Sequence, residues 1–171
     1  MKTLTLCGSM RFAQQMQTIA LELELCYDYN ILQCVYDSDA LPITEKGIEA
    51  LAAAHCRKIA LSDGIYVVDI GGYIGNSVRS EIAYAQSLEK EVLYHTAFTR
   101  DRVTRMEAFY DEALRTLPTP DPQALRTLSG YMESGLWRLD YERDERGEFP
   151  PDLKRGVLSQ DGLYDLLAEY A

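Results

Sequence analysis

Glu81 is the residue of this sequence with the clearest potential for catalysis. It lies early in a predicted helix that follows an apolar run at residues 65–68 and a glycine-containing turn. A helical wheel places it beside the side formed by Val78, Ile82 and Ala85, so we expect a half-buried carboxylate. The dipole at a helix N-terminus keeps such a group ionised. Glu81 could therefore act as a nucleophile or stabilise a cation, or it could simply complement the helix dipole.

Two turns that join predicted strands to predicted helices could bind a ligand near this carboxylate. The first combines a glycine, a serine and an arginine, and the second combines three glycines with polar residues. Glycine lets the backbone approach a ligand, and N–H groups at a helix start bind phosphate oxygens. The predicted binding residues are Gly8, Ser9, Met10, Arg11, Asp69, Gly71, Gly72, Tyr73, Gly75, Asn76 and Ser77. Both turns could instead be ordinary helix starts, with Asn76 or Ser77 as the N-cap.

His55 is the second candidate for a catalytic role. It lies in a helix predicted over residues 44–61, on the apolar face of that helix. The predicted face consists of Ile48, Leu51, Ala52, His55 and Ile59. A histidine on such a face is either a packed core residue or, beside a ligand, a group that transfers a proton. The sequence leaves both interpretations open.

The cysteines show no metal-binding pattern. Cys7, Cys26, Cys34 and Cys56 lie far apart, and no two of them form a CxxC pair. Such spacing favours separate thiols over a zinc site. We therefore expect buried, reduced cysteines and no bound metal.

Strands and helices alternate through the first half of the chain. Apolar runs predict strands at residues 2–7, 31–36, 64–69 and 92–94. The intervening helices include one over residues 77–88 and one with apolar positions at Phe12, Met16, Ile19, Ala20, Leu23 and Cys26. This alternation predicts an α/β fold, with a parallel sheet covered by helices on both faces. Ligands of such sheets bind outside the carboxyl ends of the strands, where both turns would lie.

The second half of the chain has a different pattern. No strand is predicted after residue 96, and helices are predicted over residues 103–117, 122–134 and 159–170. An aromatic and charged stretch lies between the last two of these helices. The sequence thus predicts an α/β domain at residues 1–97 and a small all-helical C-terminal module at residues 98–171. Its aromatic residues could form an interface, and they are Tyr131, Trp137, Tyr141 and Phe149.

Composition restricts the class of partner. The 171 residues carry a net charge of −10, which opposes binding to nucleic acid or to an anionic membrane surface. No apolar run approaches the roughly 20 residues that span a bilayer, and the N-terminus leads straight into a predicted strand. We expect a cytoplasmic protein that binds a small molecule.

Several short motifs in residues 2–96 resemble the nucleoside 2-deoxyribosyltransferase superfamily. They are LTLCGSMR at residues 4–11, HCRKIALSD at 55–63, IYVVD at 65–69 and SEIAYA at 80–85. The opening CGSMR is most similar to the deoxynucleoside 5′-monophosphate N-glycosidase branch. The resemblance implies a flavodoxin-like (Rossmann-like) sheet, a homodimer or larger homo-oligomer, Glu81 as nucleophile, and Gly8, Ser9 and Arg11 as nucleotide-binding residues. The C-terminal half resembles a small bacterial family of unknown function.

The leading hypothesis is an enzyme that hydrolyses or exchanges the base of a nucleoside or nucleoside 5′-monophosphate, without a metal or other cofactor. Two differences from the superfamily keep alternatives open: His55 replaces an acidic residue, and Gly75 replaces the aspartate found in transferases. One alternative is a non-catalytic nucleotide sensor that acts through the helical module. Another is an inactive sheet domain beside a functional helical module. A third is a lonely-guy-type phosphoribohydrolase, which GGYIGNSVRSE at residues 71–81 resembles.

Overall fold

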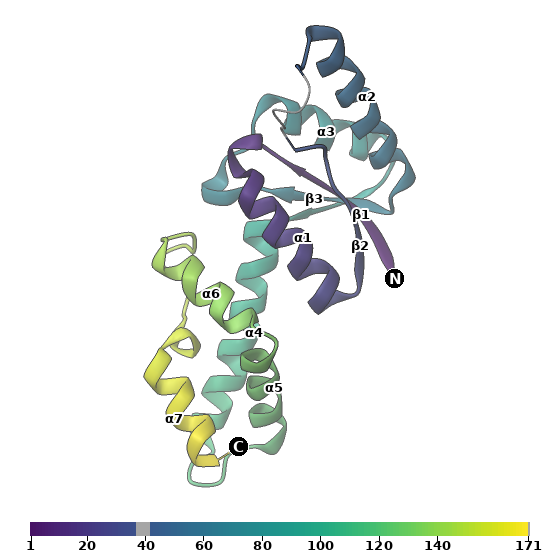
Figure 1. Cartoon of the computed structure of the whole chain (residues 1–171). Coiled ribbons are helices and arrows are strands. Elements are labelled where there is room, and N and C mark those ends of the chain that lie inside the picture. Colours follow the sequence, from purple (N-terminus) through teal and green to yellow (C-terminus); the bar gives the residue numbers. More distant parts are fainter. Residues whose placement is uncertain (37–41, 171) are drawn as a thin grey trace. The chain divides into compact units, whose positions relative to one another are not determined.

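The chain divides into two compact units, Met1–His95 and Thr96–Ala171. The computed structural model describes residues 1–36 and 42–170 (Figure 1). Within those residues, no helix is both long and apolar enough to cross a membrane. Each unit has a hydrophobic core of its own, and the two are described separately below.

The first unit contains a four-stranded parallel sheet. Its strands are β1 (Lys2–Gly8), β2 (Tyr29–Leu32), β3 (Gly64–Val68) and β4 (Glu91–Tyr94). They pair in the order β2-β1-β3-β4. This is the flavodoxin-like order, in which the connections change direction between β1 and β3. The predicted α/β fold with a flavodoxin-like parallel sheet is confirmed.

One strand lies earlier than predicted. Tyr29 and Asn30 pair with Lys2 and Thr3, so β2 ends at Leu32 instead of extending through residues 33–36. The apolar residues that suggested a strand at 33–36 have another role. Cys34 and Val35 lie beyond the end of β2 and line a cavity. The prediction for residues 33–36 was therefore wrong.

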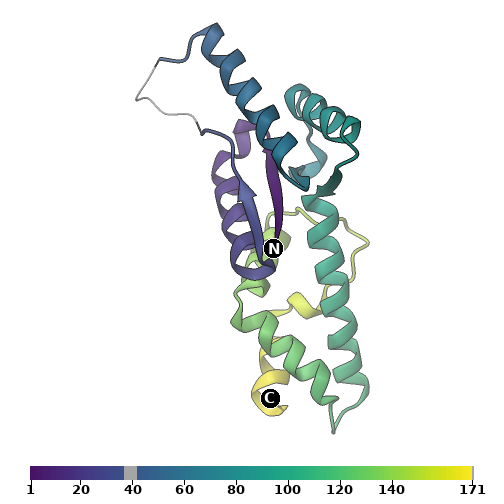
Figure 2. The same cartoon turned by 90° about the vertical axis from the view of Figure 1, so that its right-hand side faces the viewer.

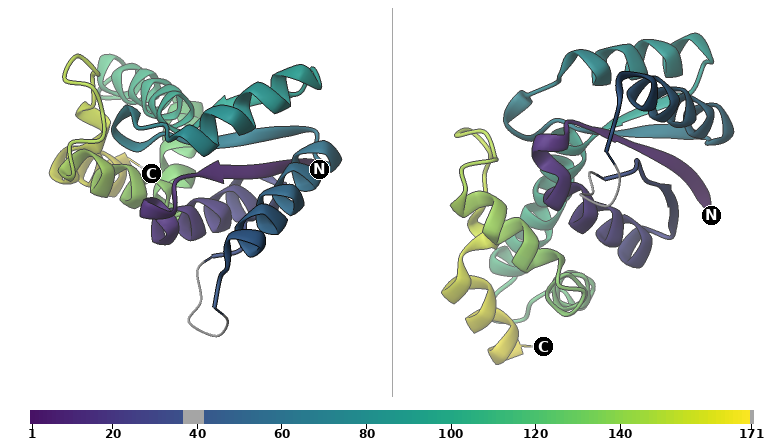
Figure 3. Two further views of the ribbon diagram at one scale, coloured as in Figure 1. Left: turned by 90° about the horizontal axis from the view of Figure 1, so that it is seen from above. Right: turned by 45° about the horizontal axis from the view of Figure 1, so that its top comes forward.

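Three helices cover the sheet, namely α1 (Ala13–Tyr27), α2 (Glu45–Leu61) and α3 (Asn76–Ser87). A short 3₁₀ turn at Met10–Phe12 precedes α1. On one face of the sheet, β1 approaches α1 so closely that a Cβ atom added to Gly8 would lie 2.8 Å from Met16 Sδ. The core of the other face joins the sheet to α2 and α3, and consists of Cys7, Ile59, Ile65, Val67, Val78 and Ala85. Figures 2 and 3 show α2 and α3 side by side.

The apolar face predicted for α2 is buried only near the end of the helix. Ile59 is fully buried, whereas Ile48 and Leu51 are 59% and 37% exposed. Figure 2 shows that α2 begins beyond the ends of the strands, so its first half has no sheet to cover. Ile48 and Leu51 line the cavity described below and are not core residues.

Gly64→Ala should destabilise the first unit. A Cβ atom there would lie 2.7 Å from the carbonyl oxygen of Glu91, a backbone atom of the adjacent strand that cannot move without disturbing the sheet. We expect a loss of about 1–3 kcal/mol in the free energy of unfolding. Differential scanning calorimetry measures it, with Gly47→Ala in α2 as the control, because that Cβ would make only ordinary contacts. Equal melting temperatures for the two variants would contradict the prediction.

The described residues of the second unit form helices joined by turns and loops, with no strand. It contains most of α4 (His95–Arg115), then α5 (Pro122–Glu133), α6 (Leu136–Glu145) and α7 (Gln160–Tyr170), with a 3₁₀ turn at Gly156–Leu158. The helices predicted at 122–134 and 159–170 are thus confirmed. Helix α4 begins eight residues before the predicted start, and α6 was not predicted at all.

The aromatic residues of the second unit stabilise its core. Tyr131, Trp137 and Phe149 are all at least nine-tenths buried, and Tyr141 stacks on Trp137. The Trp137 indole N–H donates to the carbonyl oxygen of Val157 at 2.9 Å. The hypothesis of an aromatic interface is therefore wrong for Tyr131, Trp137 and Phe149, whereas Tyr141 is half-buried against the same core.

A buried ionic cluster links two helices of the second unit. Asp140 of α6 is fully buried, and its carboxylate accepts two hydrogen bonds from the Arg102 guanidinium of α4. Arg143 and the Tyr131 hydroxyl donate to the same carboxylate at 2.9 and 2.7 Å. The Asp140 carboxylate thus pairs with two buried guanidinium groups, at a point where helices far apart in sequence meet.

Candidate functional site

A cavity of about 700 Å³ lies at the carboxyl ends of β1 and β3, where the direction of the strand connections changes. This edge is where ligands bind in doubly wound sheets. Its wall comes from the end of β1, the turn after it, the segment after β2, the helix α2 and the start of α3. The polar and ionisable lining residues are Ser9, Cys34, His55, Lys58, Tyr73, Asn76, Ser77 and Glu81.

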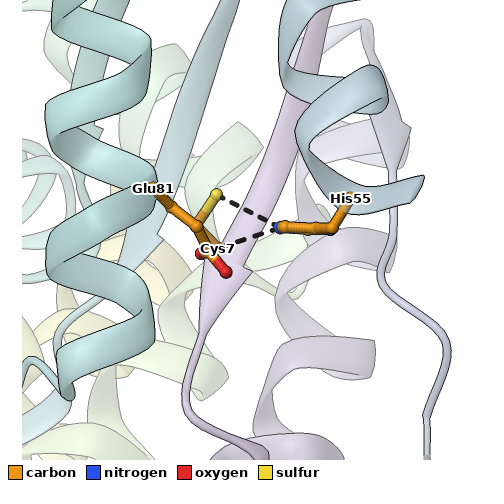
Figure 4. Close-up of side chains that lie close together, drawn as sticks. All are labelled: Cys7, His55 and Glu81. Carbon is orange, nitrogen blue, oxygen red and sulfur yellow. Dashed lines mark hydrogen bonds and ion pairs between the residues drawn. The ribbon is translucent and has the colours of Figure 1, made fainter. Parts of the chain in front are cut away.

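Three side chains from three different elements converge here, and two of them, His55 and Glu81, line the cavity (Figure 4). Nε2 of His55 lies 3.5 Å from Sγ of Cys7 and 3.6 Å from Oε2 of Glu81. Cys7 belongs to β1, His55 to α2 and Glu81 to α3. The cysteine is fully buried, while the side chains of His55 and Glu81 are 11% and 20% exposed. The prediction of a half-buried Glu81 is confirmed, and its neighbour is His55.

This cluster does not have the geometry of a cysteine protease triad. In such a triad the thiol and the carboxylate contact opposite nitrogens of the imidazole ring, whereas here both contact Nε2. Burial, followed by the negative charge of Glu81, raises the pKa of Cys7 well above its ordinary value. The thiol is therefore protonated at neutral pH and is a poor nucleophile. Glu81 is the better candidate nucleophile of the cluster.

The turn after β1 supplies part of the cavity wall but differs in detail from expectation. Gly8, Ser9 and Met10 line the cavity, and Arg11 is not among its lining residues in the described part of the chain. The Arg11 guanidinium instead lies over the ring of Tyr73, 4.4 Å from its centroid. The two predicted turns thus meet through this stacked pair. A Cβ atom at Gly8 would lie 2.8 Å from Met16 Sδ of α1 and 3.1 Å from Val68 Cβ, so packing favours glycine there.

The turn after β3 leads into α3 without a side-chain cap. Gly71 and Gly72 have positive φ angles of 62° and 73°, which glycine adopts at the least cost. Gly75 is the N-cap residue, so the prediction of Asn76 or Ser77 in that position was wrong. The first N–H group to bond within the helix is that of Arg79, which donates to Gly75. The N–H groups of residues 76–78 precede it at the cavity wall, and N–H groups at a helix start can bind an anion.

Most of the predicted site residues come together at the cavity. Gly8, Ser9, Met10, His55, Tyr73, Gly75, Asn76, Ser77 and Glu81 line it. The described lining does not include Arg11, Asp69, Gly71 or Gly72. Asp69 is buried and begins the 3₁₀ turn Ile70–Gly72, so its position after β3 serves the turn.

Sequence reasoning missed several residues of the site, among them Cys7 and Lys58. Cys7 was expected only as a buried thiol, yet strand alternation could have placed it on the face of the sheet that α2 and α3 cover. Lys58 follows His55 by three residues on α2, and this helical spacing was the available signal. Its ammonium group lines the cavity and donates to the carbonyl oxygen of Gln33.

Comparison with known families identifies part of the second unit. Residues 103–171 match the model of a domain of unknown function, DUF4298. This agrees with the expectation that the C-terminal half resembles a family of unknown function. No curated protein and no solved structure matches the chain significantly. The resemblance of residues 2–96 to the nucleoside 2-deoxyribosyltransferase superfamily finds no support in these comparisons and stays a prediction.

Proposed function

We propose that the first unit is an enzyme that cleaves or exchanges the base at the N-glycosidic bond of a nucleoside or nucleoside 5′-monophosphate. The observation that carries this proposal is the pairing of Glu81 with His55 at the wall of a cavity. A carboxylate beside an imidazole supplies a nucleophile and a proton donor within one site. The cavity is large enough for a nucleotide-sized ligand, since small-molecule sites commonly measure about 300–1,000 Å³.

In the proposed reaction, the Glu81 carboxylate attacks the anomeric carbon as the bond to the base breaks. The transition state has oxocarbenium character, and the product is a covalent ester between the sugar and Glu81. His55, whose Nε2 lies 3.6 Å from this carboxylate, donates a proton to the departing base or orients Glu81. Water, or a second base, then releases the sugar and regenerates the carboxylate.

The start of α3 provides the proposed contact for the anionic end of the ligand. Its unbonded N–H groups and the hydroxyl of Ser77 line the same cavity as Glu81, one helical turn away. A helix N-terminus binds phosphate through both its free donors and its dipole. Ser9 adds a hydroxyl from the opposite turn. A negatively charged protein can thus hold a small anion locally.

A second candidate function is nucleotide binding without catalysis. In the part of the chain that the structure describes, Glu81 is the sole carboxylate among the residues that line the cavity. Gly75 lies where transferases of the resembled superfamily have an aspartate. A domain with one carboxylate could bind a nucleotide as a sensor and leave it intact.

The direct test is to incubate the purified full-length protein with a panel of deoxynucleosides, ribonucleosides and their 5′-monophosphates. We expect release of free base from at least one of them, detected by liquid chromatography. Protein carrying Glu81→Ala, prepared identically, controls for contaminating hydrolases. The proposal fails if no substrate in the panel loses its base, or if the variant matches the wild type.

Thermal unfolding in the presence of the same compounds separates the two candidates. A ligand at 100 times its Kd stabilises the folded state by about 2.7 kcal/mol. A compound that raises the melting temperature and is recovered intact after long incubation supports the sensor. A compound that raises it and is consumed supports the enzyme.

A further inference from the structure

The cluster of Cys7, His55 and Glu81 also has the composition of a metal site. Each residue offers one ligand atom, and the three atoms all lie within 4.8 Å of one another. No other group of this kind occurs among residues 1–36 and 42–170. The three side chains come from a strand and two helices of one unit, so the fold holds them in place (Figure 4).

Two distances within the cluster match tetrahedral zinc coordination, and the third pair of ligand atoms, from Cys7 and Glu81, lies within 4.8 Å. Bond lengths of about 2.0–2.3 Å to sulfur, nitrogen and oxygen place the ligand atoms of a tetrahedral Zn²⁺ roughly 3.4–3.6 Å apart. The observed separations are 3.5 Å from Cys7 Sγ to His55 Nε2, and 3.6 Å from His55 Nε2 to Glu81 Oε2. A cation could therefore be bound with only small side-chain movements.

Two buried atoms of the cluster, Nδ1 of His55 and Oε2 of Glu81, have no hydrogen-bond partner among the described residues. The separation of Oε2 of Glu81 from His55 exceeds that of a normal hydrogen bond. A buried carboxylate oxygen without a partner is costly. A cation between the three side chains would satisfy this oxygen.

We propose that Cys7, His55 and Glu81 bind a thiophilic divalent cation, with Zn²⁺ as the best fit. Thiolate and imidazole ligands select Zn²⁺ over Mg²⁺ or Ca²⁺, which prefer oxygen ligands. Three protein ligands leave the fourth position for water on the cavity side, as in an open zinc site. On binding, Zn²⁺ replaces the thiol proton of Cys7, which passes to the solvent.

Zinc binding would also affect the proposed enzyme activity. This predicted effect rests on the proposed function. A Glu81 oxygen bonded to Zn²⁺ cannot attack an anomeric carbon, so metal occupancy and base release exclude one another. Zn²⁺ should therefore inhibit base release, and a chelator should restore it. The metal site itself requires no glycosidase activity.

The test measures metal binding on chelator-treated, reduced full-length protein. Titration with Co²⁺ should give one equivalent of thiolate-to-cobalt charge-transfer absorption, and competition with a chromophoric chelator gives the Zn²⁺ affinity. Cys7→Ser, His55→Asn and Glu81→Gln should each weaken Zn²⁺ binding by at least about 100-fold. Cys56→Ser, in the same helix as His55, is the matched control and should bind as the wild type does. Circular dichroism verifies that each variant is folded.

The possible results distinguish this inference from the proposed function. Binding that is lost in the three variants and kept in Cys56→Ser supports the site, even if no nucleoside is cleaved. Wild-type protein that binds no Zn²⁺ overturns the site, even if base release is observed. Equal affinity in Cys7→Ser and the wild type also overturns it.

Discussion

Glu81→Gln should lower the rate of base release by about 10⁴-fold or more, as expected for loss of a covalent nucleophile. The amide keeps the size of the side chain, so the cavity and the contacts of α3 should persist. It cannot form the sugar ester on which the proposed mechanism depends. The measurement is single-turnover release of base at saturating substrate, with nucleotide affinity determined separately by calorimetry. We expect the loss in the rate and little change in the Kd.

A covalent intermediate provides a second measurement of the same prediction. Quenching the wild-type reaction with acid should leave a fraction of the protein heavier by one sugar, with the added mass on the peptide that contains Glu81. The control is Glu49→Gln, because Glu49 is an exposed carboxylate on α2 and does not line the cavity. A Glu81→Gln variant that keeps a tenth of the wild-type rate would show that Glu81 is not the nucleophile.

Asp140→Asn should destabilise the second unit by about 3–5 kcal/mol. The substitution removes the negative charge that Arg102 and Arg143 share, and the side chains of both arginines are at least 95% buried. Removing one partner of a buried ion pair is expensive because a charge then stays in a medium of low polarity. A loss of this size is comparable with the whole stability of many domains of this length.

The single tryptophan of the chain allows the unfolding of the second unit to be followed in the full-length protein. Trp137 is buried in the core of the second unit, so its fluorescence during urea denaturation reports the unfolding of that unit. Asp111→Ala is the control, because Asp111 pairs with Lys154 at the surface and its loss should change the midpoint little. Equal urea midpoints for Asp140→Asn and Asp111→Ala would contradict the prediction.

The spacing of apolar residues predicted most of the fold. It failed where charged residues are buried and where apolar residues line a cavity. The strands and helices of the first unit were found because Leu4, Ile65 and Ile59 lie on regularly spaced, buried positions. Helix α6 was missed because its buried face includes Asp140 and Arg143, which a hydropathy pattern counts as exposed. The first half of α2 was assigned to the core for the opposite reason, since Ile48 and Leu51 are apolar but line a cavity.

The candidate site was predicted in its parts and not in its arrangement. The types and positions of Glu81 and His55 suggested roles for each, but no spacing along the chain could show that α2 and α3 bring them within 3.6 Å. That distance depends on strand order, which places β1 beside β3 and thus sets both helices on one face of the sheet. The contact between Arg11 and Tyr73 has the same origin, since the two turns lie at the ends of adjacent strands.

The ionic cluster around Asp140 extends beyond the segment that matches the DUF4298 family. The segment shared with the DUF4298 family begins at Val103, inside helix α4, and Arg102 is the residue immediately before it. A gene that encoded only residues 103–171 would keep Asp140 and Arg143 and lose one of the two arginines that neutralise the carboxylate. Such a segment would lack two of the four hydrogen bonds that the Asp140 carboxylate accepts here, so the residue that precedes it affects the stability of the cluster.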